Sequence, residues 1–212
     1  MTWRKVTIAA EQNTSAEPHD ASKPTTCVAR RTRMRVFITF ILSAIIIVDS
    51  VAAQKAVHAT LEPVADRKRA PAFMLRDRSG KAVDLSKYNG RVILLNFWAT
   101  DCGGCRTEVP WFVEFQKKYK RRGLTVVGVS MDILYEDLKG PDEAWQRVNP
   151  FVAAHKVAYP ILMGDDVVTT AYDIKALPAT YLIDRSGKVA TKYIGLVDRD
   201  NLQSNLEALL NE

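Results

Sequence analysis

Two stretches of this 212-residue chain are almost continuously apolar, and the segment between them repeats apolar residues at helical spacing. Residues 92–97 and 124–130 are typical of strands covered on both faces of a sheet. Residues 106–122 predict an amphipathic helix that ends before Gly123, and Pro110 removes one of its backbone hydrogen bonds, which predicts a kink. The order strand, helix, strand indicates an α/β protein.

Shorter patterned segments lie on either side of this centre. The further predicted strands are 73–75, 81–85, 159–163 (an edge strand or extended segment), 179–184 and 188–194, and the further predicted helices are 142–156, 167–172 and a last one around 202–210. The first two and the last two of these strands form hairpins, because turn residues separate them. Pro150 should bend or interrupt the first helix, and Asp198 or Asp200 caps the last one. Together the segments predict one α/β domain with a central mixed sheet.

The amino-terminal part has the order of an export signal. Basic residues over 30–35 precede an apolar stretch of 13 residues, 36–48, and small residues lead up to Ala53. A membrane span needs roughly 20 apolar residues, so this stretch is short for one. Residues 34–53 therefore predict a signal peptide cleaved after Ala53, with an uncleaved membrane anchor as the alternative.

The remaining boundaries follow from composition. Residues 1–33 are polar and lack apolar periodicity, so they predict a disordered leader, or a mis-assigned start if translation begins at Met34. Residues 54–69 are small and charged, contain Pro63 and show no core pattern, which predicts a linker. The folded domain is then 70–212.

Charge excludes one class of partner. The whole chain has a net charge of +6, but residues 1–53 hold 7 of its 30 basic and 4 of its 24 acidic residues, which leaves +3 on the rest. That is an ordinary solubilising charge, and no nucleic-acid partner is predicted. The one basic cluster, 117–122, lies at the end of a predicted helix, where cations complement the helix dipole.

The chemistry is concentrated in two of the three cysteines. Cys27 lies in the leader, whereas Cys102 and Cys105 stand between the first central strand and the helix that follows. Unpaired N–H groups and the dipole at a helix start favour a thiolate at Cys102. Cys105, one turn later, can attack a mixed disulfide formed at Cys102, which is the minimal machinery of dithiol–disulfide exchange. A second C-x-x-C is missing from the sequence, and a closed zinc site needs four ligands, so no metal is predicted.

Two motifs carry a family resemblance. Residues 96–110 (NFWATDCGGCRTEVP) and 176–187 (ALPATYLIDRSG) resemble the TlpA/ResA-like thiol–disulfide oxidoreductases of the AhpC/TSA-redoxin superfamily, from about Ala70 to the carboxyl end. The resemblance implies a thioredoxin-like fold with an extra amino-terminal β-hairpin, and no cofactor. It also implies a monomer that reacts with protein clients in the periplasm or at the outer face of the cytoplasmic membrane. A membrane redox partner would re-reduce the pair, and reduction of cysteines for haem attachment is a role of this family type.

The resemblance also assigns roles to residues. Cys102 matches the nucleophile and Cys105 the resolving thiol of a redox-active disulfide. Pro178 matches a cis-proline, which would present the backbone of Leu177 to an extended substrate chain; a trans proline opening a strand is the alternative. Trp98 is a candidate substrate-binding residue, although a packing role is favoured for so large an aromatic side chain.

Glu108 is the candidate acid–base residue. It lies one turn after Cys105, and family members have a glutamate there that influences proton transfer. Thioredoxins proper have a buried aspartate six residues before the first cysteine, but this chain has Asn96 at that position. The alternative is a surface glutamate in the first turns of a helix, where acids are favoured.

The active-site motif departs from the family pattern at two places. Asp101 replaces the usual tryptophan before Cys102, and its carboxylate opposes formation of a neighbouring thiolate. The dipeptide Gly103-Gly104 replaces one that contains proline and loosens the turn. We therefore predict that the pair acts as a reductant.

Two other functions remain open at this level. A peroxiredoxin shares the fold, but Thr100 alone does not supply the residues expected around a peroxidatic cysteine. A redox-inert adaptor could bind clients beside Pro178 without cycling its cysteines.

Overall fold

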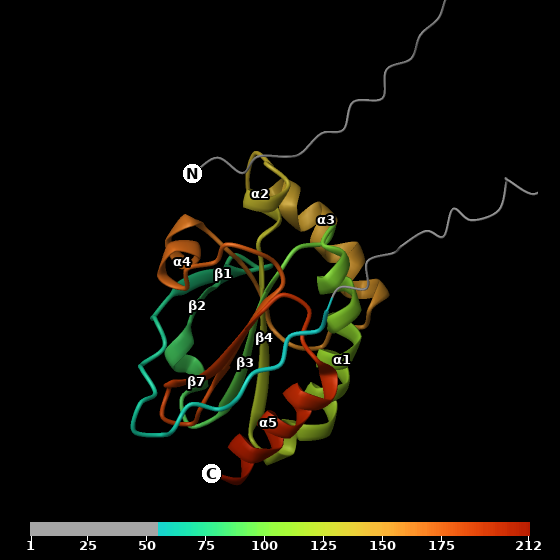
Figure 1. Cartoon of the computed structure of the whole chain (residues 1–212). Helices are drawn as coiled ribbons and strands as arrows, with labels where there is room; N and C mark the ends of the chain where they lie inside the picture. Colours follow the sequence, from blue (N-terminus) through green and yellow to red (C-terminus); the bar gives the residue numbers. More distant parts are fainter. Residues whose placement is uncertain (1–54) are drawn as a thin grey trace, which may run out of the picture. The chain divides into compact units, whose positions relative to one another are not determined.

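The computed structural model describes residues 55–212, which form one compact unit (Figure 1). The predictions for 1–33 and 34–53 lie outside the described residues. Among residues 55–212, no helix is both long and apolar enough to cross a bilayer. The elements in chain order are β1 Met74–Asp77, β2 Ala82–Asp84, the 3₁₀ helix η1 Leu85–Tyr88, β3 Val92–Trp98, α1 Gly103–Tyr119, the 3₁₀ helix η2 Lys120–Arg122, β4 Leu124–Ser130, α2 Asp132–Tyr135, α3 Pro141–Ala154, β5 Ile161–Met163, α4 Asp166–Ala171, β6 Ala179–Ile183, β7 Val189–Ile194 and α5 Arg199–Asn211.

The strands form one seven-stranded mixed sheet in the order β2-β1-β5-β4-β3-β6-β7. β3 lies inside the sheet, with β4 parallel on one side and β6 antiparallel on the other. β1 pairs with β2 as an antiparallel hairpin and with β5 through its other edge. The prediction of an edge strand over 159–163 is therefore wrong, because β1 covers the outer edge of β5. The sheet ends at β2 and β7.

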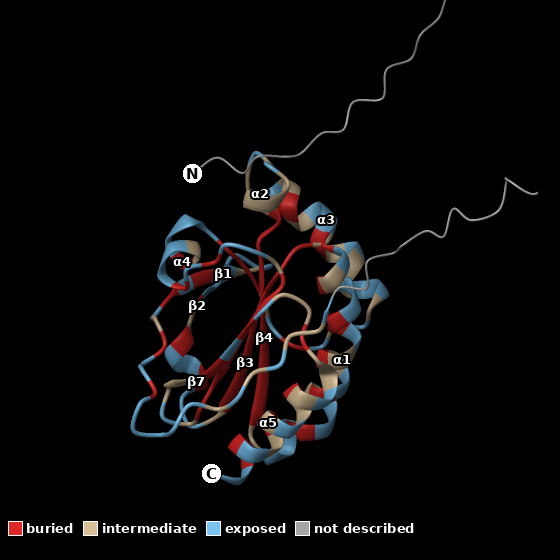
Figure 2. Ribbon diagram, viewed as in Figure 1, coloured by how far each residue is buried: buried red, intermediate tan, exposed pale blue. Residues whose placement is uncertain are grey.

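Alternate residues of β3 supply two cores, one on each face of the sheet. Val92 and Leu94 pack with residues of α1 and α5, whereas Ile93 and Leu95 pack with η1 and α4. In Figure 1, α1 and α5 lie side by side on one side of the sheet, with α4 on the other. Every residue of β3 and β4 is buried, which Figure 2 shows as continuous red strands, so the apolar runs predicted as central strands are confirmed.

Two helices, α1 and α3, differ from the predictions made for them. α1 begins at Gly103, three residues before the predicted start, because Cys102 is its N-cap. α3 continues through Pro150, so the predicted interruption does not occur. A proline within a helix removes one N–H donor, and the packing of Ala144 and Val148 against the core keeps α3 in place. Asp198 caps α5, as predicted.

Residues 55–69 pack on the domain, in contrast to the predicted linker. Their apolar side chains at Val57, Ala59 and Leu61 pack against the core that α1 and α5 share. Arg67 is buried, and its guanidinium lies 3.1 Å from the Asp184 carboxylate and 2.6 Å from that of Glu212. Composition alone missed these contacts because their partners come from the far end of the chain. The folded unit therefore begins well before residue 70.

Candidate redox site

The sheet register brings the two sequence motifs together. β3 and β6 run antiparallel, and Phe97 near the end of β3 pairs with Ala179 at the start of β6. The residues that precede β6, Leu177 and Pro178, therefore lie beside the segment that follows β3, which leads to Cys102. The peptide bond between Leu177 and Pro178 is cis, as predicted.

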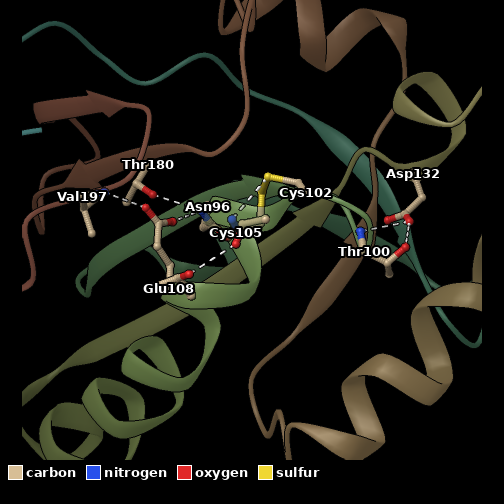
Figure 3. Close-up of a disulfide and its surroundings, with 10 residues drawn as sticks. Asn96, Thr100, Cys102, Cys105, Glu108, Asp132, Thr180 and Val197 are labelled. Atoms are coloured by element: carbon tan, nitrogen blue, oxygen red, sulfur yellow. Dashed lines mark hydrogen bonds between the residues drawn. A yellow bond between two sulfur atoms is a disulfide. The ribbon is translucent and has the colours of Figure 1, made fainter. Parts of the chain in front are cut away.

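Cys102 and Cys105 form a disulfide at the start of α1, with a sulfur–sulfur distance of 2.07 Å (Figure 3). The Cys102 sulfur accepts a hydrogen bond of 3.3 Å from the backbone N–H of Cys105, so the sulfur itself caps the helix. A negative sulfur at this position is stabilised by the helix amides and dipole. Cys102 is 5% exposed and Cys105 is completely buried, so an incoming molecule meets Cys102 first.

A groove of about 430 Å³ opens at the disulfide. Its lining residues come from five parts of the chain: Lys55, Val57, Cys102, Gly103, Gly104, Tyr135, Leu177, Pro178, Ile194, Gly195 and Leu196. Within residues 55–212, Ile194 is one of the few large apolar residues that are exposed, at 41%. An apolar side chain at the rim of a groove suits contact with another polypeptide.

Glu108 is fully buried, which excludes the surface-glutamate alternative. Its carboxylate accepts a 2.8 Å hydrogen bond from the backbone N–H of Val197, and the amide of Asn96 lies 3.5 Å away, at the limit of a hydrogen bond. Burial raises the pKa of Glu108 to about 8, and the Val197 hydrogen bond opposes this rise. A carboxyl with such a pKa can both accept and donate a proton near neutral pH.

Asn96 links this carboxyl to the sheet. Its side-chain amide donates a 3.0 Å hydrogen bond to the Thr180 hydroxyl on the neighbouring strand. In Figure 3, Asn96, Thr180 and Val197 surround the Glu108 carboxylate on one side of the disulfide. The position that is an aspartate in thioredoxins is thus a neutral hydrogen-bond donor here, and Glu108 is the carboxyl of the site.

Trp98 does not reach the groove. Its side chain is 1% exposed and packs against Phe151 of α3, with the ring centroids 5.0 Å apart. This burial favours the packing role for Trp98, and a role in substrate binding stays a prediction. The reason for the burial is the alternation along β3, which directs Trp98 under α3 and away from the surface.

Asp132 is a site residue that the sequence did not indicate. It is fully buried beyond the end of β4 and accepts hydrogen bonds from the backbone N–H of Thr100 at 3.1 Å, the hydroxyl of Thr100, and the hydroxyl of Ser130 at 2.8 Å. These bonds fix the loop that leads from β3 to Cys102, on the opposite side of the disulfide from Glu108 (Figure 3). The signal that could have found it is an aspartate two residues after the apolar run of 124–130.

Solved structures with a similar fold are redox proteins. The thioredoxin domain of a thiol-disulfide oxidoreductase from Bacteroides vulgatus is 27% identical, with a TM-score of 0.56, and the match covers 68% of this chain and 96% of that one. A thiol:disulfide interchange protein of the thioredoxin family from Chlorobium tepidum is 25% identical, with a TM-score of 0.58 and coverage of 68% and 97%. The fold and the dithiol at the helix start define a thiol–disulfide oxidoreductase of the thioredoxin class.

The chain belongs to the AhpC/TSA family, whose sequence profile matches residues 67–192. The thiol-disulfide oxidoreductase ResA of Bacillus subtilis (strain 168) is 33% identical over 165 residues, which cover 77% of this chain and 87% of that protein. The family resemblance inferred from residues 96–110 and 176–187 is therefore confirmed.

Proposed function

We propose that this oxidoreductase acts outside the cytoplasm as a reductant of disulfides in protein clients. The observation that carries the proposal is the Cys102–Cys105 disulfide, which is buried on one side and opens through Cys102 onto a groove beside Leu177 and Pro178. Such a groove suits a polypeptide substrate, because the residue before the cis-proline and the apolar side chain of Ile194 both line it beside Cys102.

The proposed reaction begins with the reduced pair. The Cys102 thiolate attacks one sulfur of a client disulfide, a mixed disulfide forms, and the other client sulfur leaves as a thiolate that takes up a proton. Cys105 then loses its proton and attacks the Cys102 sulfur. The second client thiolate leaves, and the product is the Cys102–Cys105 disulfide. The client gains two electrons, which the Cys102–Cys105 pair loses. Of the two protons that the client sulfurs take up, one corresponds to the proton lost by Cys105 and the other to the proton that Cys102 gave to solvent when its thiolate formed.

Glu108 is proposed as the group that takes the Cys105 proton. It lies one turn after Cys105 on α1, and burial gives it a pKa of about 8, close to that of an ordinary thiol. Proton transfer between groups of similar pKa needs little driving force. A buried carboxyl without a cationic partner among residues 55–212 is also costly to the fold, which favours a functional reason for it.

The reducing direction is proposed from the residues around Cys102. Asp101 is exposed next to it and opposes the thiolate, and Gly103-Gly104 adds chain freedom at the first turn of α1. A less stabilised thiolate makes the disulfide form relatively more stable, so the reduced pair gives up its electrons more readily.

Location and partners rest on the leader and on the relatives. The predicted signal or anchor over 34–53 supports a periplasmic site, or one on the outer face of the cytoplasmic membrane. A membrane redox partner would restore the dithiol after each turnover. Clients that receive haem at a reduced cysteine pair, as in cytochrome c maturation, are a substrate class compatible with a ResA relative.

Client trapping tests the proposal most directly. The Cys105→Ser variant keeps the attacking thiol but cannot release the mixed disulfide, so it should accumulate covalent client complexes, whereas Cys102→Ser should accumulate none. Titration of the wild-type pair against a redox buffer should give a potential far below about −120 mV, the value of a strong oxidant. Failure of Cys105→Ser to trap clients would favour a redox-inert adaptor, and rapid consumption of hydrogen peroxide by the wild type would favour a peroxidase.

A further inference from the structure

Residues 55–61, called the strap below, run along the segment that joins β7 to α5 and form one wall of the groove. The strap is the first part of the cyan trace in Figure 1, where the coloured chain begins. Its Lys55 and Val57 line the groove together with Cys102. Farther along, the backbone N–H of Ala59 donates a 3.0 Å hydrogen bond to the side chain of Asn201 on α5.

Val57 is held by two backbone hydrogen bonds. Its N–H donates to the carbonyl of Leu196 at 2.7 Å, and its carbonyl accepts from the N–H of Asp198 at 2.9 Å. This is the pattern of a parallel bridge between Val57 and Val197. The residues before and after Val197 thus bond to the strap, while the N–H of Val197 itself points away from it.

The backbone N–H of Val197 points toward the redox site. Because backbone groups of an extended chain alternate between its two sides, fixing Leu196 and Asp198 on the strap turns the Val197 N–H inward. That N–H donates the 2.8 Å hydrogen bond to the Glu108 carboxylate, and Val197 is 1% exposed. Water therefore cannot easily replace the bond if the segment shifts.

We propose that the strap positions the redox centre: by pairing with Leu196 and Asp198, Val57 aims the Val197 N–H at the Glu108 carboxylate. Val57 and Asn201 are then positioning residues, which act on Glu108 through the β7–α5 connection. The functional consequence rests on the proton-transfer role proposed for Glu108. The positional claim itself does not.

Other titratable groups lie near Glu108, and the test must separate their titration from that of Glu108. Among residues 55–212, these groups include Cys105, one turn earlier on α1, Tyr159 before β5, and Asp198, the neighbour of Val197. Tyr159 is buried, and its pKa is raised by burial and by the charge of Glu108. Asp198 is engaged by the Asn201 N–H and by His58 of the strap. In the oxidised protein the cysteines carry no ionisable proton, so Glu108 can be titrated without them.

The experiment is an NMR titration of the Glu108 side-chain carboxyl in the oxidised, full-length protein. Val57→Pro removes the N–H that bonds Leu196 and should raise the Glu108 pKa by about one pH unit, because the carboxylate loses support from Val197. Thr60→Pro is the matched control. Thr60 is exposed, and its amide makes no hydrogen bond found among residues 55–212, so the Glu108 pKa should stay unchanged.

Each outcome decides the proposal. An equal shift in both proline variants, or no shift in Val57→Pro, overturns it. If Val57→Pro does not fold, Asn201→Ala loosens the strap at Ala59 and must shift the pKa in the same direction, and no shift there also overturns it. Client trapping by Cys105→Ser is measured in parallel, in a protein whose strap is unchanged. It tests the oxidoreductase function alone, so failure of the strap proposal can be distinguished from failure of the proposed function.

Discussion

Replacing Glu108 by glutamine removes a carboxyl that folding must bury, and the effect on stability can be worked out from its pKa. The pKa is about 8 in the folded protein, against 4.5 for a free glutamate. Since the folded-state pKa is raised, the folded state binds the proton more tightly than the unfolded state does. The free energy of unfolding is therefore highest below about pH 4.5. Above that pH it falls by about 1.4 kcal/mol per pH unit, until the pH reaches the pKa of Glu108 in the folded protein.

Between about pH 5 and about pH 9 this single carboxyl should reduce the free energy of unfolding by up to about 4 kcal/mol. The Glu108→Gln variant keeps an oxygen that can accept the Val197 N–H, but it has no charge to bury. Its free energy of unfolding should therefore change with pH by about 4 kcal/mol less than that of the wild type. All other groups titrate in both proteins and cancel in the comparison.

Guanidinium unfolding of the oxidised proteins at several pH values measures this difference. Glu114→Gln is the matched control, because Glu114 lies on the same helix but is exposed and paired with Arg199. Its pH profile should follow that of the wild type within a few tenths of a kcal/mol. Parallel profiles for wild type and Glu108→Gln would refute the reasoning, since they would mean that Glu108 is no harder to ionise in the folded than in the unfolded protein.

Two further predictions concern the buried ion pair of Arg67 and the groove beside Cys102. Arg67→Ala should lower the free energy of unfolding by about 3–5 kcal/mol in denaturant titrations, because Asp184 would stay buried without its partner, whereas Lys68→Ala, at an exposed neighbouring position, should change it little. Ile194→Asp should slow reaction with a protein disulfide about fivefold, the equivalent of about 1 kcal/mol of lost apolar contact, and leave the rate with a small disulfide unchanged. The same substitution at Met74, which is exposed on β1 and does not line the groove, should affect neither rate, and equal slowing of both substrates by Ile194→Asp would argue against a client groove.

Local patterns predicted most of the fold. The nearly continuous apolar residues of β3 and β4 indicated strands that are buried on both faces. The C-x-x-C at the start of the following helix indicated the chemistry without any knowledge of the sheet. Errors arose where pairing partners are distant in sequence. Residues 159–163 looked like an edge strand because the sequence does not show that β1 adds to β5.

The sequence by itself determined the reactive pair, since a strand, a short turn and a helix bring Cys102 and Cys105 together within a few residues. Only the tertiary structure decided the environment of that pair. Glu108 meets the Val197 N–H across 89 positions of sequence, and Arg67 meets Glu212 across 145. Burial and hydrogen-bond partners at such distances depend on the assembled sheet and helices, and local residue patterns carry no information about them.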